Sequence, residues 1–123
     1  MTGLVQVLGV VFGVLLITVG IVESFVMRDY RRDRLFIDPD GAEPARLRTF
    51  NLGFYNVIWG IGALTGALML GGADAIAGQS VLLVICVAHL GLGLIMFFSE
   101  RRLWVLAVAE GFLPLTITIL LLV

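Results

Sequence analysis

Four long apolar runs alternate with two short clusters that contain every arginine of this 123-residue chain, and this pattern constrains the fold more than any other feature. The runs cover residues 4–27, 50–70, 81–98 and 103–123. A helix needs about 20 residues to cross the hydrocarbon core of a bilayer, and each run is close to that length. Backbone polar groups in lipid must be hydrogen-bonded within the chain, so helices are the expected structure. The sequence therefore predicts an all-α membrane protein, an antiparallel bundle of four transmembrane helices.

Composition agrees with a chain that is covered largely by lipid. Hydrophobic residues make up 60% of it and charged residues 14%, against about 45–50% and about 25% in an average soluble domain. A chain of this length has room for a single domain, residues 1–123. The net charge of −1 gives no reason to expect a nucleic-acid partner. The one cysteine, Cys86, is expected to pack as a small apolar side chain.

The arginines predict the orientation of the bundle. Six of them lie in the loop 28–49, two lie between the third and fourth runs, and the termini and the second connection have no basic residue. Loops rich in Arg or Lys stay in the cytoplasm, which places both termini outside. The first run has neither a basic n-region nor an Ala-x-Ala cleavage site, so we expect an uncleaved first span.

The loop 28–49 is expected to be partly helical. Charges at helical spacing over residues 28–36 predict that the first helix continues for two turns. The residues 38–41 predict a turn, and Pro44 is expected in the first turn of the next helix. The simplest role for this loop is a solvated linker whose arginines touch lipid headgroups. A specific anionic-lipid site is the alternative, but five acidic residues weaken the local positive field.

Small residues recur at the spacing that lets two helices approach closely, as in Gly9-x-x-x-Gly13. This predicts tight packing within the bundle and leaves homo-oligomerisation open. The second run also carries two adjacent stripes at helical spacing. One stripe contains Asn51, Tyr55, Trp59, Gly62 and Gly66, and the other contains Asn56, Gly60, Ala63 and Ala67.

Polar side chains within the four runs fall at similar depths. At a rise of 1.5 Å per residue, Glu23 lies about 6 Å from the cytoplasmic end of its run, and Tyr55 and Asn56 lie about 8–9 Å in. Glu110 lies about 10 Å in and His89 about 13 Å. Because ionisable groups in a membrane usually face the bundle interior, we expect a polar pocket that opens to the cytoplasm. The candidate ligand-binding residues are Glu23, Asn51, Tyr55, Asn56, Trp59, His89 and Glu110.

Each of these residues also has a purely structural explanation. Glu23 at the membrane boundary can reach water or pair with Arg28, and the amides can hydrogen-bond to neighbouring helices. Glu110 needs a partner, such as His89, because a buried carboxylate must be protonated, paired or hydrated. The alternative to a pocket is thus a hydrogen-bond network that fixes helix register. With one histidine and no paired-ligand spacing, neither a metal nor a cofactor is expected.

The stretch Asn51-Leu52-Gly53-Phe54-Tyr55-Asn56 resembles the Asn-x-Gly-x-Tyr-Asn signature of the domain of unknown function 1304 family, a group of small four-span bacterial membrane proteins. Glu23-Ser24-Phe25 is similar to the family's Glu-x-Phe at the end of the first span, and Cys86-Val87 with the Gly-rich stretch to Gly93 looks like its third span. The resemblance covers essentially the whole chain. It implies that Glu23, Asn51, Tyr55 and Asn56 form a unit, and it implies no activity.

Two positions depart from the family's pattern. Leu52 stands where the signature usually has Gln, and Glu110 stands where the fourth span tends to have Gln. The second exchange adds a charge, so the resemblance does not extend to a site that uses Glu110.

Four functions fit these observations. The first is binding or transport of a small amphiphile, such as a lipid, an isoprenoid or a quinone-like molecule, in a pocket with polar groups at its mouth and an apolar floor. Nearly level with it is an accessory subunit of a larger membrane complex. A small proton-coupled exporter ranks third, because the arginine bias fixes one orientation, whereas many such exporters are dual-topology dimers. An enzyme with Glu110 or Glu23 and His89 as an acid–base pair ranks last.

Overall fold

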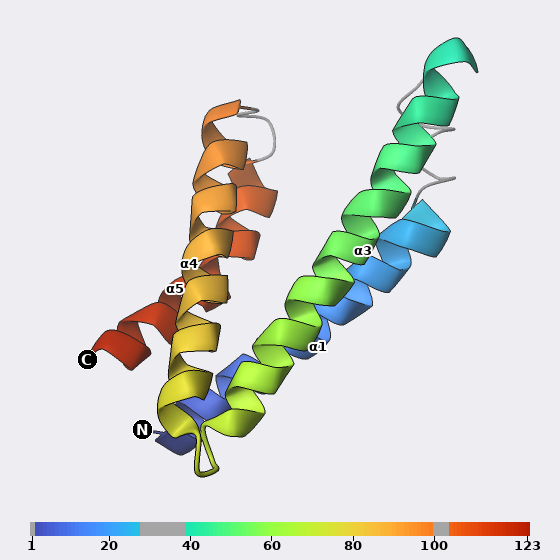
Figure 1. Ribbon diagram of the computed structural model, residues 1–123. Coiled ribbons are helices and arrows are strands. Elements are labelled where there is room, and N and C mark those ends of the chain that lie inside the picture. Colours follow the sequence, from blue (N-terminus) through green and yellow to red (C-terminus); the bar gives the residue numbers. More distant parts are fainter. Residues whose placement is uncertain (1, 28–38, 100–103) are drawn as a thin grey trace. The chain divides into compact units, whose positions relative to one another are not determined.

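A computed structural model describes residues 2–27, 39–99 and 104–123, and this part of the chain is helical except for residues 70–74 and Val123 (Figure 1). Its α-helices are α1 (Thr2–Val22), α3 (Pro39–Met69), α4 (Ala75–Ser99) and α5 (Trp104–Leu122). A short π-helix, η1 (Glu23–Met27), follows directly on α1. The all-α prediction is confirmed.

The second helix begins earlier than predicted. α3 starts at Pro39 rather than Pro44, and it runs without a break into the second apolar run. The turn predicted over residues 38–41 is therefore wrong for residues 39–41. Proline suits the first position of a helix, because its fixed φ is helical and its missing N–H would have no helical partner there. The predicted helical extension over residues 28–36 lies outside the described residues, as do Asp38 and residues 100–102 of the short turn expected between the third and fourth runs.

The connection between the second and third runs is also shorter than predicted. α4 begins at Ala75, although the third run was expected to start at Val81. The carbonyl oxygen of Asp74 accepts a hydrogen bond from the N–H of Gly78 at 3.0 Å, which is the first bond of the helix. Asp74 thus occupies the N-cap position, where aspartate is favoured. Gly and Ala in residues 71–80 had suggested a longer loop.

Three helical segments of the described chain are long and apolar enough to cross a membrane: Gly3–Phe25, Phe50–Met69 and Ala75–Ser99. A further apolar segment, Ala107–Leu122, is shorter and falls within the fourth expected span. Large apolar side chains on all four helices are exposed, among them Val11, Ile58, Val84 and Phe112. An exposed apolar surface of this extent is typical of helices that lipid surrounds.

The chain divides into two compact units. Unit 1 contains Met1–Phe12 and Gly62–Val123, and unit 2 contains Gly13–Ile61. Helices α1 and α3 contribute one end to each unit. The expectation that the chain is one domain stays a prediction.

Unit 1 has its core along α4. Leu82 and Cys86 are fully buried, as is Ile117 of α5. α4 and α5 lie side by side and antiparallel (Figure 1), and the side-chain amide of Gln79 donates a hydrogen bond to the carbonyl oxygen of Leu121 at 3.2 Å. Pro114 is buried within α5. Because proline has no N–H, it cannot donate the usual helical hydrogen bond to the carbonyl oxygen of Glu110.

An apolar groove of about 270 Å³ lies between α4 and α5. Small residues on both helices, Gly93, Ala107 and Gly111, are part of its lining, and Phe97, Phe112 and Leu115 are among the larger side chains there.

Unit 2 is an antiparallel helix pair, made of the second part of α1 with η1 and the first part of α3 (Figure 1). Ser24 lies opposite Phe50, and Ile17 lies opposite Gly60. This pair contains most of the polar residues that the sequence had singled out.

Candidate functional site

The π-helix η1 follows α1 at the first of these polar residues along the chain. Its five residues, Glu23–Met27, begin with the glutamate itself. A π-turn accommodates one more residue than an α-turn and changes the direction of the side chains that follow, and such turns occur frequently at functional sites. The local geometry of Glu23 is thus not that of an ordinary α-helical residue.

Glu23 is hydrogen-bonded to Asn56 of α3. The side-chain N–H of Asn56 (Nδ2) donates to Oε1 of Glu23 at 2.9 Å, and both side chains are half-buried. Within the part of the chain that the structure describes, this is the only hydrogen bond that either side chain makes. The bond joins the two helices of unit 2 through a carboxylate and an amide.

Ser24 makes a second link between the same helices. Its hydroxyl donates a hydrogen bond to the carbonyl oxygen of Phe50 at 2.9 Å. The Ser24 side chain is buried, with 1% of its surface exposed. The donor of Ser24 is therefore used inside the helix pair and is not presented to the surface.

Glycines let the two backbones touch beside these bonds. A Cβ added to Gly53 would meet the hydroxyl oxygen of Ser24, and it would lie only 2.5 Å from the carbonyl oxygen of Gly20. A Cβ added to Gly60 would lie 2.7 Å from the carbonyl oxygen of Gly13. Real Cβ atoms do not approach oxygen so closely, because the electron clouds overlap. The α1–α3 contact of unit 2, which we call the glycine seam, therefore requires residues without side chains at Gly20, Gly53 and Gly60.

Three phenylalanines pack together at the same end of unit 2. Phe25 of η1 makes edge-to-face contacts with Phe50 and Phe54 of α3, with ring centroids 5.9 Å and 6.0 Å apart. Phe50 and Phe54 are 5.0 Å apart. Edge-to-face packing is a favoured arrangement of aromatic rings. This cluster adds to the hydrogen bonds that hold η1 against α3.

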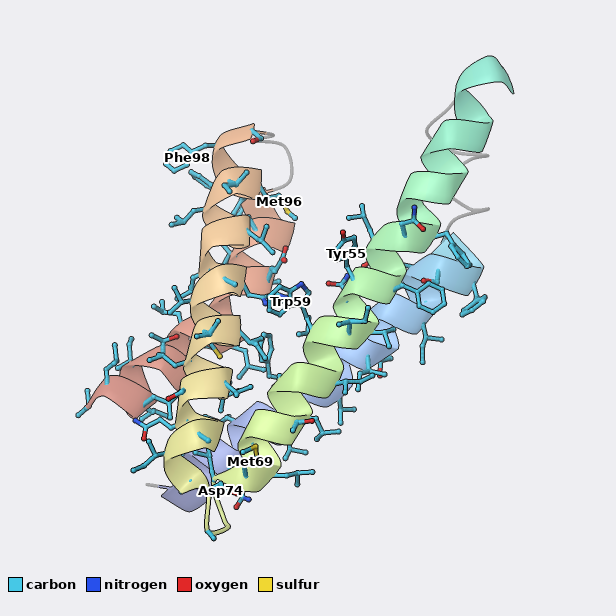
Figure 2. All side chains as sticks on the ribbon, viewed as in Figure 1. Tyr55, Trp59, Met69, Asp74, Met96 and Phe98 are labelled. Carbon is cyan, nitrogen blue, oxygen red and sulfur yellow. The ribbon has the colours of Figure 1, made fainter. Side chains whose placement is uncertain are left out.

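The neighbouring stripe of α3 is more open. Asn51 and Tyr55 are exposed, Tyr55 with 62% of its surface, and Trp59 is half-buried. Figure 2 shows Tyr55 and Trp59 projecting from the same side of α3. Neither the Asn51 amide nor the Tyr55 hydroxyl makes a hydrogen bond to the residues described.

The other two candidate residues belong to unit 1. His89 has 1% of its surface exposed; its Nδ1 lies 3.0 Å from the carbonyl oxygen of Ile85, and its ring packs edge-to-face on Phe12 at 5.4 Å. Glu110 is half-buried on α5. A pocket that combines these two residues with the five of unit 2 stays a prediction. No group of three or more His, Cys, Asp or Glu side chains with the proximity of metal ligands occurs among residues 2–27, 39–99 and 104–123.

Several residues of the site have roles that the sequence pattern did not assign. Of the motif Glu23-Ser24-Phe25, only Glu23 was among the candidate site residues, yet Ser24 and Phe25 also hold η1 against α3. Gly53 lay inside the quoted signature without a role. One sequence signal did point to Gly53. A glycine within a helix lowers the stability of that helix, so its presence there indicates that another backbone approaches closely.

The fold and this site define a class: a small all-helical protein with membrane-length apolar helices and a polar pair held across a glycine seam. The family model described as protein of unknown function (DUF1304) matches residues 10–123, and the chain belongs to that family. No curated protein and no solved structure matches the chain.

Proposed function

We propose that this protein is a four-span integral membrane protein of a bacterial inner membrane, and that it binds the headgroup of a small amphiphile at the Glu23–Asn56 pair. The membrane assignment is supported by the three helical segments of spanning length and by the extent of exposed apolar surface. The confinement of all arginines to alternate connections supports cytoplasmic placement of those connections, with both termini outside.

One observation carries the proposed site: the 2.9 Å hydrogen bond between Asn56 and Glu23. A carboxylate at the end of a membrane-length segment is costly to desolvate, so its retention there needs a reason. Asn56 occupies only Oε1, and Oε2 makes no hydrogen bond to the residues described. With respect to the residues that the structure describes, the pair therefore has unused hydrogen-bonding capacity, which a ligand can satisfy.

The surroundings of the pair suit an amphiphile. Asn51 and Tyr55 provide further polar groups on the adjacent stripe of α3, with exposed side chains. Exposed apolar side chains occur within two residues of each member of the pair in the sequence: Phe25, Phe54 and Ile58. A ligand with a polar head and an apolar tail finds partners of both kinds within two helical turns.

The orientation is tested by cysteine labelling in intact cells. In a Cys86→Ala background, a cysteine introduced by Asp74→Cys should react with a membrane-impermeant maleimide from outside. A cysteine introduced by Arg34→Cys should react only after the cells are broken. Labelling of the second variant in intact cells would contradict the proposed orientation.

Ligand binding is tested by native mass spectrometry of protein purified from its own membrane in a mild detergent. The wild-type protein should carry an amphiphile adduct, and Glu23→Ala and Tyr55→Phe should lose most of it. The control Asp74→Ala removes an exposed acidic side chain outside the site and should keep the adduct. Because Tyr55 is exposed, Tyr55→Phe should leave thermal stability in detergent unchanged.

Two outcomes speak against the proposed binding function. One is a wild-type protein without any adduct, and the other is an adduct that all variants retain equally. Recovery of the wild-type protein only as part of a larger complex, without a bound amphiphile, would favour an accessory subunit.

A further inference from the structure

The chemistry of the Glu23–Asn56 pair narrows the kind of headgroup that it can bind. An ionised carboxylate only accepts hydrogen bonds, so the atom of Asn56 that lies 2.9 Å from Oε1 is the amide nitrogen, the donor. The amide oxygen of Asn56, Oδ1, then lies on the other branch of the side chain. It makes no hydrogen bond to the described part of the chain, and neither does Oε2 of Glu23.

Two donors closest to the carboxylate along the chain and across the pair are already used. The hydroxyl of Ser24 donates to the carbonyl oxygen of Phe50 and is buried. One N–H of Asn56 is used by Glu23 itself. Toward the described part of the chain, the pair therefore presents one remaining N–H of Asn56 and two acceptor oxygens, the Oε2 of the Glu23 carboxylate and the Oδ1 of Asn56.

We infer that the ligand's headgroup is a hydrogen-bond donor with positive charge, a primary ammonium, and not a phosphate or a carboxylate. This inference rests on the proposed function, since it names the ligand class of the same site. An ammonium group has three N–H donors and no acceptor, so it matches two acceptor oxygens and neutralises the carboxylate. An anionic headgroup would instead place a second negative charge beside the half-buried carboxylate, which is unfavourable.

The substitution Glu23→Gln isolates this chemistry from the packing of the helices. Glutamine has the same length as glutamate, and its amide oxygen can still accept the hydrogen bond from Asn56. Its other branch is an NH₂ group, which replaces the acceptor Oε2 by an uncharged donor. The variant thus keeps the hydrogen bond between the helices but presents a hydrogen-bond donor to the ligand in place of an acceptor.

The experiment uses the full-length protein in nanodiscs of neutral phosphatidylcholine and three probes with the same tail: dodecylammonium, dodecanol and dodecyl phosphate. Equilibrium dialysis measures saturable binding above the partition into empty nanodiscs. We expect the wild-type protein to bind dodecylammonium at least about tenfold more tightly than dodecyl phosphate, as for a charge-assisted hydrogen bond. Dodecanol, a neutral donor, should lie between them.

Glu23→Gln should weaken dodecylammonium binding about tenfold and leave dodecanol binding nearly unchanged. The matched control Asp74→Asn also converts one carboxylate to an amide, in the turn before α4, and should bind like the wild-type protein. Thermal unfolding of both variants in detergent verifies that they are folded.

The inference is overturned if dodecylammonium has no advantage over dodecyl phosphate, or if Glu23→Gln does not change that advantage. A preference for dodecyl phosphate that Glu23→Gln alters would refute the ammonium assignment and leave the proposed binding function standing. The binding function fails separately, through the absence of an amphiphile adduct on the natively purified protein.

Discussion

The glycine seam of unit 2 and the α4–α5 pair of unit 1 are both antiparallel helix contacts, but they differ in how closely the two helices approach. In the seam, an added Cβ at Gly53 or Gly60 would lie 2.5–2.7 Å from a backbone oxygen of α1. Between α4 and α5, a Cβ added to Gly93 would lie 3.4 Å from the carbonyl oxygen of Ala107, and one on Gly111 would have its nearest neighbour at 3.9 Å. The first contact has no room for a methyl group, and the second has room to spare beside the apolar groove.

This difference shows what a small residue accomplishes in each place. In the seam, backbone contact brings Glu23 within hydrogen-bonding distance of Asn56 and seals Ser24 from solvent. Between α4 and α5, the small residues leave a groove, and the helices are held by apolar side chains and by the bond from Gln79 to Leu121. Close packing in lipid depends on such steric fit, because the hydrophobic effect no longer drives helices together.

The largest effect is expected for Gly53→Ala. The new methyl group would overlap the Ser24 hydroxyl and the Gly20 carbonyl, so the two helices of unit 2 must separate. Overpacking of this kind costs about 3 kcal/mol in free energy of unfolding. Unfolding in mixed micelles with a denaturing detergent measures this cost. A loss below about 0.5 kcal/mol would show that the seam is no tighter than the α4–α5 pair.

Ser24→Ala is expected to have an intermediate effect. The variant removes the 2.9 Å hydrogen bond to the Phe50 carbonyl but leaves the space between the helices almost unchanged. A loss of about 1 kcal/mol is typical of a buried hydrogen bond, and the same unfolding measurement detects it. Thr18→Ala serves as the control, because its hydroxyl bonds to Val14 of the same helix at an exposed position. Equal losses in both variants would argue that Ser24 does not link α1 to α3.

The smallest effect, and of opposite sign, is expected for Gly111→Ala. Its methyl group meets nothing closer than 3.9 Å, so the substitution adds no clash. Alanine loses less conformational freedom than glycine when a helix forms, which stabilises a helix interior by about 0.5–1 kcal/mol. Gly91→Ala, where an added Cβ would have no neighbour within 4 Å, should behave alike. Destabilisation by Gly111→Ala alone would mean that α4 and α5 approach more closely than described.

The apolar pattern of the chain was sufficient to predict the helices but not their ends. Hydrophobic runs mark where lipid or a core surrounds the chain, and α1, α3, α4 and α5 each include most of one of the four runs. The ends depend on capping and on backbone geometry, which hydrophobicity does not record. Pro39 and Asp74 decided where α3 and α4 begin, and both had been assigned to connecting segments.

The polar pair was predicted in part. Residue count along the apolar runs led us to expect Glu23 and Asn56 at a similar level, and the two side chains are hydrogen-bonded to each other. Depth says nothing of which face of a helix a side chain occupies. The π-turn at Glu23 rotates the side chains that follow it away from the positions that an α-helical wheel gives. The sequence pattern therefore did not predict the hydrogen bond from Asn56, the burial of Ser24 or the packing of Phe25.

The π-turn also bears on how related sequences align. A π-turn equals an α-helix with one residue inserted, so a homologue that lacks a residue between Gly20 and Met27 would form an uninterrupted α-helix there. Such a deletion would leave Gly13 and Gly20 in register with α3, while every later side chain would rotate by about 100°. Length variation at this one position is therefore a marker, readable without a structure, for relatives that have lost the carboxylate–amide link.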